Sequence, residues 1–202
     1  MGEEVSKPGL NPWTIPNLIS LLRLAAMPLF LWLLFSRHNR VGAAWLLALL
    51  GATDWVDGYI ARRFNQISLL GKVLDPLADR LLLGIGIISM MIDHSVPLWF
   101  AWSVIAREVL VSIAAIVLGV LGARRIDVTW VGKCGAFGLM TAFPFFLLGH
   151  AHISTHHVWT VVAWCTGIPG LALAWWALAQ YVPAGRKALA EGRLERHTHA
   201  VS

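Results

Sequence analysis

The chain has 202 residues, of which 57% are hydrophobic and only 13% are charged. An ordinary soluble domain carries about 25% charged residues, so this composition excludes a soluble globular protein and indicates a membrane protein. The net charge of +5 is modest, and beside apolar segments it favours contact with anionic headgroups over binding of nucleic acid.

Six apolar runs approach the ~20 residues that a helix needs to cross a bilayer. They predict spans at Leu18–Phe35, Val41–Ile60, Pro76–Ile92, Pro97–Leu121, Lys133–Gly149 and Val158–Val182. The predicted fold is an all-α integral membrane protein with six transmembrane helices. Residues 1–17 are expected to form a cytoplasmic or interfacial segment, residues 18–182 the membrane domain, and residues 183–202 a cytoplasmic tail. The end of this tail, with His197 and His199, is expected to be disordered and to face the headgroups.

The basic residues of the connections predict the orientation of these spans. With the N-terminus inside, the outer connections hold only Arg37 and Arg40. The inner ones hold eleven basic residues: Lys7, Arg62, Arg63, Lys72, Arg124, Arg125, Lys133, Arg186, Lys187, Arg193 and Arg196. Positive charge concentrates on the cytoplasmic side of membrane proteins. We therefore expect a multi-pass protein of the plasma membrane with both termini in the cytoplasm.

Four charged residues fall within or at the ends of predicted spans. Arg23 and Arg80 fit either a side chain that extends to the membrane surface or one that faces the bundle interior. Arg107 and Glu108 lie about ten residues into their span, which is too deep for easy escape to the surface. For this pair the sequence favours a buried ion pair or a functional role.

Four of the eleven acidic residues lie within one stretch, TDWVDGYIARRFNQISLLGKVLDPLADR, at residues 53–80. Asp54 and Asp57 are three apart, and Asp75 and Asp79 are four apart. On helices, both spacings place the two positions on one face, about a turn from each other. The connection between the pairs is long enough for a helix end, a turn and a helix start, so the pairs can converge at the cytoplasmic side.

Converging carboxylates repel each other by about 4 kcal/mol per close pair at ~4 Å and an effective dielectric constant near 20. Mg²⁺ or Mn²⁺ would relieve this repulsion, because both prefer oxygen ligands. A two-metal site suits displacement at phosphorus, and one carboxylate can deprotonate an attacking hydroxyl. Taken singly, each aspartate has a plainer explanation: Asp75 precedes Pro76 and could cap a helix, and Asp54 and Asp57 could be interface charges.

Small residues are interleaved with the aspartates. Gly58 follows Asp57, and Ala61 lies one turn further on, which leaves room for a flat group or a phosphate. Arg62 adds a planar cation that suits phosphate oxygens. Gly71 fits either this role or close packing of helices.

Together these residues form the pattern Asp54-x2-Asp57-Gly58-x2-Ala61-Arg62-x8-Gly71-x3-Asp75-x3-Asp79. It resembles the complete signature of the CDP-alcohol phosphotransferases at all eight positions. The stretches TIPN (Thr14–Asn17), IAREV (Ile105–Val109) and Gly132-Lys133 resemble the bacterial branch of phosphatidylglycerophosphate synthases and cardiolipin synthases. The resemblance covers most of residues 13–149.

The resemblance implies a six-helix membrane enzyme, usually dimeric, with its site in a cytoplasmic-side cavity. Asp54, Asp57, Asp75 and Asp79 would hold a pair of Mg²⁺ or Mn²⁺ ions, and Asp79 would also be the general base. The residues that would accommodate the cytidine diphosphate part of CDP-diacylglycerol are Asp54, Gly58, Ala61, Arg62 and Gly71. The reaction would release CMP and leave a new phosphodiester.

The acceptor alcohol is less sharply defined. Glycerol-3-phosphate carries a dianion, and basic residues expected on or near the cytoplasmic side could bind it: Arg107, Arg124, Arg125 and Lys133. Against this acceptor, phosphatidylglycerophosphate synthases usually carry a second Arg eight residues after the Arg of IARE, and here that position is Ala115. The stretch Gly132–Gly149 also resembles cardiolipin synthases, whose acceptor is phosphatidylglycerol. The sequence favours glycerol-3-phosphate narrowly, on the signature and IARE.

Two other classes of membrane protein stay open from the residues alone. A transporter could use intramembrane carboxylates as an ion site, although the aspartates cluster at one face and no inverted repeat is visible. A structural scaffold would not explain the aspartate spacing. The histidine-rich stretch HAHISTHH, at residues 150–157, is expected to be an external polar loop.

Overall fold

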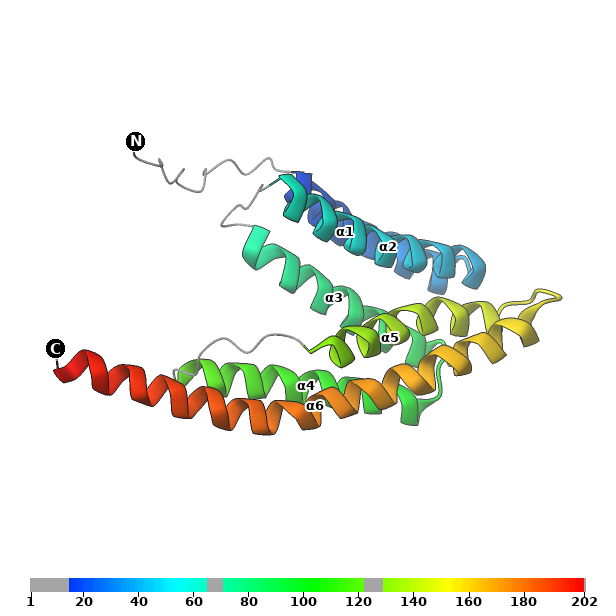
Figure 1. The fold of residues 1–202 in the computed structure, drawn as a ribbon. Coiled ribbons are helices and arrows are strands. Elements are labelled where there is room, and N and C mark those ends of the chain that lie inside the picture. Colours follow the sequence, from blue (N-terminus) through cyan, green and yellow to red (C-terminus); the bar gives the residue numbers. More distant parts are fainter. Residues whose placement is uncertain (1–14, 65–70, 122–128, 202) are drawn as a thin grey trace. The chain divides into compact units, whose positions relative to one another are not determined.

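The computed structural model describes the backbone of residues 15–64, 71–121 and 129–201, and side chains within 21–53, 80–118, 120–121, 129–181 and at Pro183. Within these ranges the chain is helical and contains no strand. The helices are α1 (Ile15–Leu31), the short π-helix η1 (Trp32–Ser36), α2 (Arg40–Phe64), α3 (Gly71–Ile92), α4 (Leu98–Val120), α5 (Trp130–Gly149) and α6 (His156–Val201) (Figure 1). Each predicted span overlaps one of these helices, and α1 with η1 accounts for the first.

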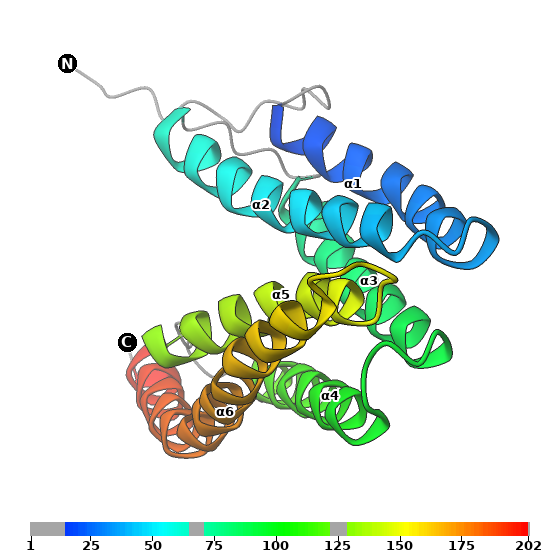
Figure 2. The ribbon, with the colours of Figure 1, turned by 90° about the vertical axis from the view of Figure 1, so that its right-hand side faces the viewer.

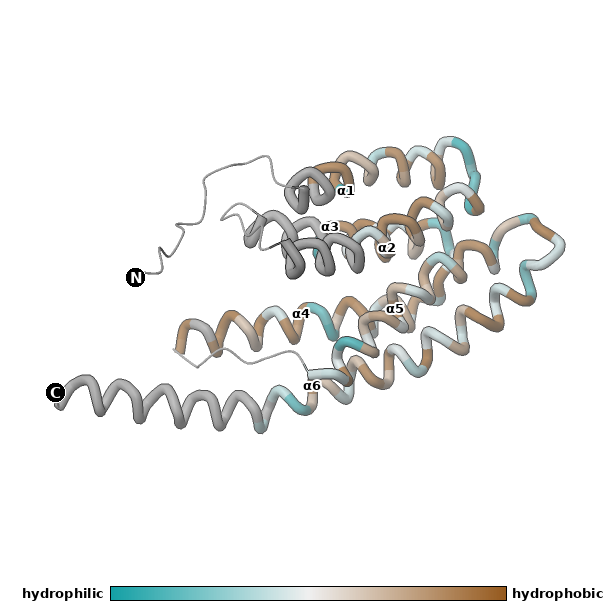
Figure 3. The backbone as a smooth tube through the Cα atoms, turned by 45° about the horizontal axis from the view of Figure 1, so that its top comes forward, coloured by the Kyte–Doolittle hydropathy of each residue, from teal (hydrophilic) through white to brown (hydrophobic). Residues whose placement is uncertain are grey.

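Three of the described segments are long and apolar enough to cross a membrane: Leu98–Leu118, Trp130–Gly149 and His156–Tyr181. Three shorter apolar segments lie in the other helices, at Leu21–Ser36, Arg40–Thr53 and Arg80–Ile92. Figure 3 shows the apolar colour over much of the described length of α1 to α6, with hydrophilic colour at several connections. The prediction of an all-helical membrane protein is confirmed, and the count of six spans stays a prediction.

Two helix boundaries differ from the sequence prediction. The third span was expected from Pro76, but α3 begins at Gly71 and includes Asp75 and Pro76. Asp75 therefore lies within the helix, not at its N-cap. The expectation of disorder at the end of the tail is also wrong, because α6 continues to Val201. Alanine, leucine, glutamate and arginine dominate much of this tail, and all have high helix propensity.

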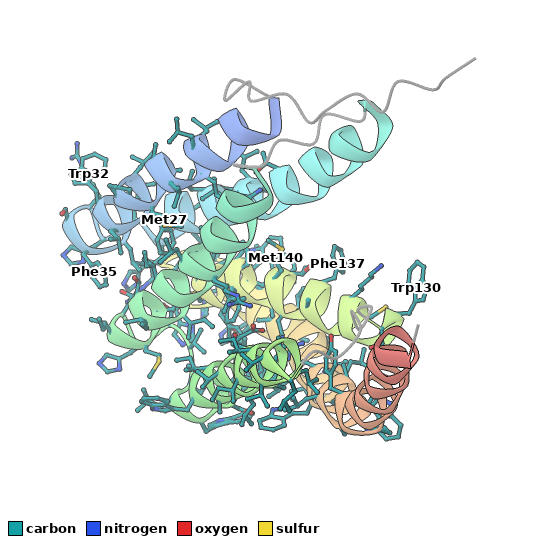
Figure 4. The ribbon with its side chains drawn as sticks, turned by 90° about the vertical axis from the view of Figure 1, so that its left-hand side faces the viewer. Met27, Trp32, Phe35, Trp130, Phe137 and Met140 are labelled. Atoms are coloured by element: carbon teal, nitrogen blue, oxygen red, sulfur yellow. The ribbon has the colours of Figure 1, made fainter. Side chains whose placement is uncertain are left out.

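The chain forms two compact units, and the first comprises Met1–Val96 and Phe143–Thr160. In this unit α1 packs against α2 and α3, and Figure 2 shows α1 and α2 side by side. Met27 of α1 forms a buried cluster with Leu50 of α2 and Leu82 of α3. Figure 4 shows Met27 in this unit, whereas Trp32 and Phe35 lie at its periphery. The three residues of this cluster lie at the same height along the three helices, so the heights of other residues can be counted from them.

A polar clamp closes one end of the first unit. The guanidinium of Arg40, the first residue of α2, donates from Nε to Asp93 Oδ2 over 2.8 Å and from Nη1 to the carbonyl oxygen of His150 over 2.9 Å. Ser95 Oγ donates to the same carboxylate over 2.6 Å. Asn39 caps α2 by accepting a hydrogen bond from the backbone N–H of Gly42 over 2.9 Å. Since Arg40 begins α2 and Asp93 follows α3, the aspartate-rich segments lie toward the opposite end of these helices.

The second unit comprises Pro97–Ala142 and Val161–Ser202. There α5 and α6 approach closely at glycines, and the two backbones leave no space for a side chain. A Cβ added to Gly170 would lie 2.9 Å from the carbonyl carbon of Gly138, and one added to Gly135 would lie 2.7 Å from the backbone nitrogen of Ala174. Small residues allow this approach, which is common among membrane helices. Trp130 and Phe137 project away from α5 (Figure 4) and are exposed.

Replacing Gly170 with alanine should destabilise the protein, because the methyl group meets backbone that must shift. Overpacking of this kind typically costs about 1–3 kcal/mol. Gly84→Ala is the matched control, since a Cβ at Gly84 meets nothing within 4 Å and alanine is the better helix former. Thermal unfolding in detergent should show a lower midpoint for Gly170→Ala and an unchanged or higher midpoint for Gly84→Ala. Equal midpoints for the two variants would contradict the close crossing of α5 and α6.

Candidate active site

The residues predicted to hold metal and donor fall on two helices of the first unit. Asp54, Asp57, Gly58, Ala61 and Arg62 belong to α2, and Gly71, Asp75 and Asp79 belong to α3. The side chains of all eight lie outside the described part of the structure, so their roles stay predictions. The helical backbone at these positions does fix their spacing: each aspartate pair lies about one turn apart on one helix face.

Counting from the buried cluster gives the level of each aspartate. Asp54 is four residues beyond Leu50, and Asp79 is three residues before Leu82. At 1.5 Å per residue, both positions lie about 4.5–6 Å from the cluster, toward the end opposite the clamp. Asp57 and Asp75 are each seven residues away, at about 10.5 Å. The four positions therefore occupy two successive levels at one end of the first unit.

The two arginines near predicted span ends differ in the structure. Arg23 of α1 is 1% exposed, whereas Arg80 of α3 is exposed. Arg23 lies on the helix face that also carries Met27, Phe30 and Leu34, all buried. For Arg23 the structure decides between the two possibilities left by the sequence: the side chain faces the bundle interior.

Arg107 continues the buried face of α4, after Phe100 and Val104, and is 8% exposed. Its Nη1 donates to Oε1 of the neighbouring Glu108. Its Nε is buried and has no hydrogen-bond partner among the described residues. The predicted pairing is present, although only Arg107 is buried and Glu108 is half-exposed. The guanidinium retains a donor that an added anionic group could satisfy.

The other predicted acceptor residues lie near the ends of α4 and α5. Lys133 is exposed in the first turns of α5, where its Nζ lies 5.3 Å from the centre of the Trp130 ring. Arg124 and Arg125 lie outside the described residues.

No group of three or more His, Cys, Asp or Glu that could hold a metal ion occurs in the described part. In the stretch HAHISTHH, Nδ1 atoms of His150 and His156 lie 3.0 Å from backbone carbonyls, of Phe146 and Ile153.

Comparison with known proteins identifies the group to which these features belong. The profile described as CDP-alcohol phosphatidyltransferase matches residues 13–181, which include both aspartate pairs, Arg107 and Lys133. The chain belongs to the CDP-alcohol phosphatidyltransferase family. The resemblance seen in the signature is thereby confirmed.

Relatives of this phosphatidyltransferase carry two names. The cardiolipin synthase (CMP-forming) of Streptomyces coelicolor is 39% identical over 86% of this chain and 83% of its own length. The putative cardiolipin synthase of Mycobacterium tuberculosis is 36% identical over 83% of this chain and 80% of its own length. A CDP-diacylglycerol--glycerol-3-phosphate 3-phosphatidyltransferase of Shigella flexneri is 30% identical over 86% of this chain and 96% of its own length. The chain is therefore a membrane transferase of phospholipid biosynthesis, and the family favours an enzyme over a transporter or a scaffold.

Proposed function

We propose that this phosphatidyltransferase transfers the phosphatidyl group of CDP-diacylglycerol to phosphatidylglycerol, and so forms cardiolipin and CMP. The observation that carries the acceptor is the higher identity to cardiolipin synthases, 39% against 30% for the glycerol-3-phosphate enzyme, over the same share of this chain. Ala115 points the same way, because it is exposed on α4 and offers no guanidinium. This proposal reverses the narrow preference for glycerol-3-phosphate that was based on the signature and the IARE stretch.

The chemical step is a displacement at phosphorus. Asp79 accepts the proton of a glycerol hydroxyl of the acceptor, as a general base. The hydroxyl oxygen forms a bond to the phosphorus that carries the diacylglycerol. The bond from that phosphorus to the oxygen shared with the cytidine monophosphate part breaks, and CMP leaves with the electron pair. Asp79 lies one turn from Asp75 on α3, which puts a base beside the carboxylates proposed to bind metal.

Asp54, Asp57, Asp75 and Asp79 would hold the divalent metal. Their fit rests on the donor set: four carboxylates at two successive levels of α2 and α3, which both pack against α1, supply the hard oxygen ligands that Mg²⁺ and Mn²⁺ prefer. When bound, a pair of such ions neutralises charge on the attacking and leaving oxygens. The carboxylates themselves fix where the diphosphate of the donor can lie.

The donor would bind along α2. Gly58 and Ala61 follow Asp57 on the helix, and as small residues they would leave room for the cytidine diphosphate part. Asp54 borders this space, Arg62 supplies a planar cation for phosphate oxygens, and Gly71 opens α3 where the chain returns.

The acceptor would bind through its phosphate. Arg107 carries the buried Nε without a partner in the described residues, and a phosphate oxygen is a suitable acceptor for it. Lys133, Arg124 and Arg125 complete the proposed set. Glycerol-3-phosphate stays the second candidate acceptor. The similarity to the glycerol-3-phosphate enzyme of Shigella flexneri extends over 86% of this chain and 96% of that enzyme.

The acceptor is tested by offering both alcohols in parallel. Purified protein in detergent receives labelled CDP-diacylglycerol and Mn²⁺ with either phosphatidylglycerol or glycerol-3-phosphate, and the lipid products are separated. The proposal predicts labelled cardiolipin with phosphatidylglycerol and no labelled phosphatidylglycerophosphate. Product with glycerol-3-phosphate alone would overturn the choice of acceptor and leave the reaction type standing.

Arg107→Gln should raise the KM of the acceptor and leave the KM of CDP-diacylglycerol near that of the wild type. A charge-assisted hydrogen bond contributes about 1.5–3 kcal/mol, which corresponds to about 10- to 150-fold in KM. Arg37→Gln is the matched control, since Arg37 is exposed and lies over the Trp32 ring in the connection to α2. An equal rise in both KM values for Arg107→Gln would argue against an acceptor role.

The proposed orientation puts both termini and the aspartates in the cytoplasm, in a multi-pass protein of the plasma membrane. The excess of basic residues on that side supports it. A homodimer and a six-span count, both implied by the family resemblance, belong to the same proposal.

A further inference from the structure

Arg23 is a full charge in the interior of the first unit. At 1% exposure it is among the largest fully buried side chains of the described residues. An unpaired buried cation is costly, so such residues pair with anions or with several hydrogen-bond acceptors. The structure does give Arg23 an interacting neighbour.

The level of Arg23 follows from the same buried cluster that places the aspartates. Arg23 is four residues before Met27 on α1, on the face that packs against α2 and α3. The end of α1, the start of α2 and the end of α3 share the clamp side of the unit. Residues that precede Met27 on α1 therefore lie on the side of the cluster away from the clamp, and Arg23 lies about 6 Å from the cluster on that side. Positions 54 and 79 lie at the same height.

Few acidic residues of the first unit could neutralise the charge of Arg23. Between Ile15 and Val96, and again between Phe143 and Thr160, the only acidic residues are Asp54, Asp57, Asp75, Asp79 and Asp93. Asp93 is bonded to Arg40 and Ser95 at the clamp end. The four aspartates of the signature are the carboxylates on the helices against which α1 packs, and they lie at or one turn beyond the level of Arg23.

We infer that Arg23 is a positioning residue of the metal site: it brings a buried positive charge to the level of positions 54 and 79, where the divalent ions are proposed to bind. The planar fork of arginine suits carboxylate oxygens. The inference rests on the proposed placement of the metal at the four aspartates. Groups that orient metal ligands typically contribute about 10- to 100-fold to metal affinity.

Direct binding of Mn²⁺ to the full chain in detergent, followed by the electron paramagnetic resonance of the free ion, tests this role without turnover. Arg23→Met should raise the Kd of Mn²⁺ about tenfold or more. Arg23→Lys should give a smaller rise, since an ammonium keeps the charge but lacks the fork. Met27→Ala is the matched control on the same helix face: it should lower the unfolding temperature and leave the Kd unchanged.

An unchanged or lower Kd in Arg23→Met would overturn the inference, as would an equal rise in Met27→Ala. Should Arg23→Met fail to elute as a folded protein, Arg23→Lys decides, and wild-type affinity in that variant overturns the inference. Asp57→Asn separates this inference from the proposed function. If Asp57→Asn binds Mn²⁺ as the wild type does, the metal site is elsewhere; if it binds weakly while Arg23→Met binds normally, only the role of Arg23 is lost.

Discussion

Asp79→Asn should abolish phosphatidyl transfer while the protein stays folded and still binds Mn²⁺ through Asp54, Asp57 and Asp75, with lower affinity. Asparagine matches the shape of aspartate but cannot accept the proton of the acceptor hydroxyl. General-base catalysis contributes about 10²–10⁴-fold to rate, so kcat should fall by at least the lower of these factors. Release of CMP from CDP-diacylglycerol with phosphatidylglycerol as acceptor measures the loss.

The same substitution at Asp93 is the control for Asp79→Asn. Asp93 accepts hydrogen bonds from Arg40 and Ser95 at the clamp, and loss of its charge should weaken that end of the unit. We expect a lower unfolding temperature and normal turnover per folded molecule. Turnover near that of the wild type in Asp79→Asn would remove Asp79 from the role of base.

Ala61→Leu should block binding of the donor nucleotide, because the larger side chain fills the space proposed beside α2. We expect the KM of CDP-diacylglycerol to rise steeply, or saturation to be lost, with the fold retained. Ala52→Leu is the matched control, since Ala52 is exposed on the same helix and its enlargement should leave the KM unchanged.

A donor KM unaffected by Ala61→Leu would show that the nucleotide lies elsewhere. The affinity is best followed by competition with CDP, which lacks the lipid and so separates the nucleotide site from the membrane phase. Equal inhibition of wild-type and variant protein by CDP would contradict the assignment of Gly58 and Ala61.

The sequence predicted the helices well because each is marked by an apolar run of membrane-spanning length, as α4 and α5 show. It misplaced the start of α3 because Pro76 is a strong helix-start signal, while the helix itself begins at Gly71. It missed the helical tail because charge and polarity there suggested a solvated end. In both segments the local residue types, a proline in one and charged and polar residues in the other, predicted the wrong helix boundary.

The candidate site divides in the same way. The metal and donor residues are proposed from the sequence alone, because the aspartate spacing predicts the chemistry and their side chains lie outside the described residues. Arg23 could not be assigned, since a lone arginine near a span end fits both surface and interior. Its i, i+4, i+7, i+11 spacing with Met27, Phe30 and Leu34 was the available signal. Only burial in the structure shows that this charge belongs to the same face as the apolar residues.

The most direct test of the account is CMP release by the purified wild-type protein from CDP-diacylglycerol and phosphatidylglycerol, with and without Mn²⁺. We predict CMP and cardiolipin in equal amounts with the metal, none after chelation, and recovery when Mn²⁺ is restored. CMP release that persists after complete removal of divalent ions would contradict a metal-dependent transfer at the four aspartates.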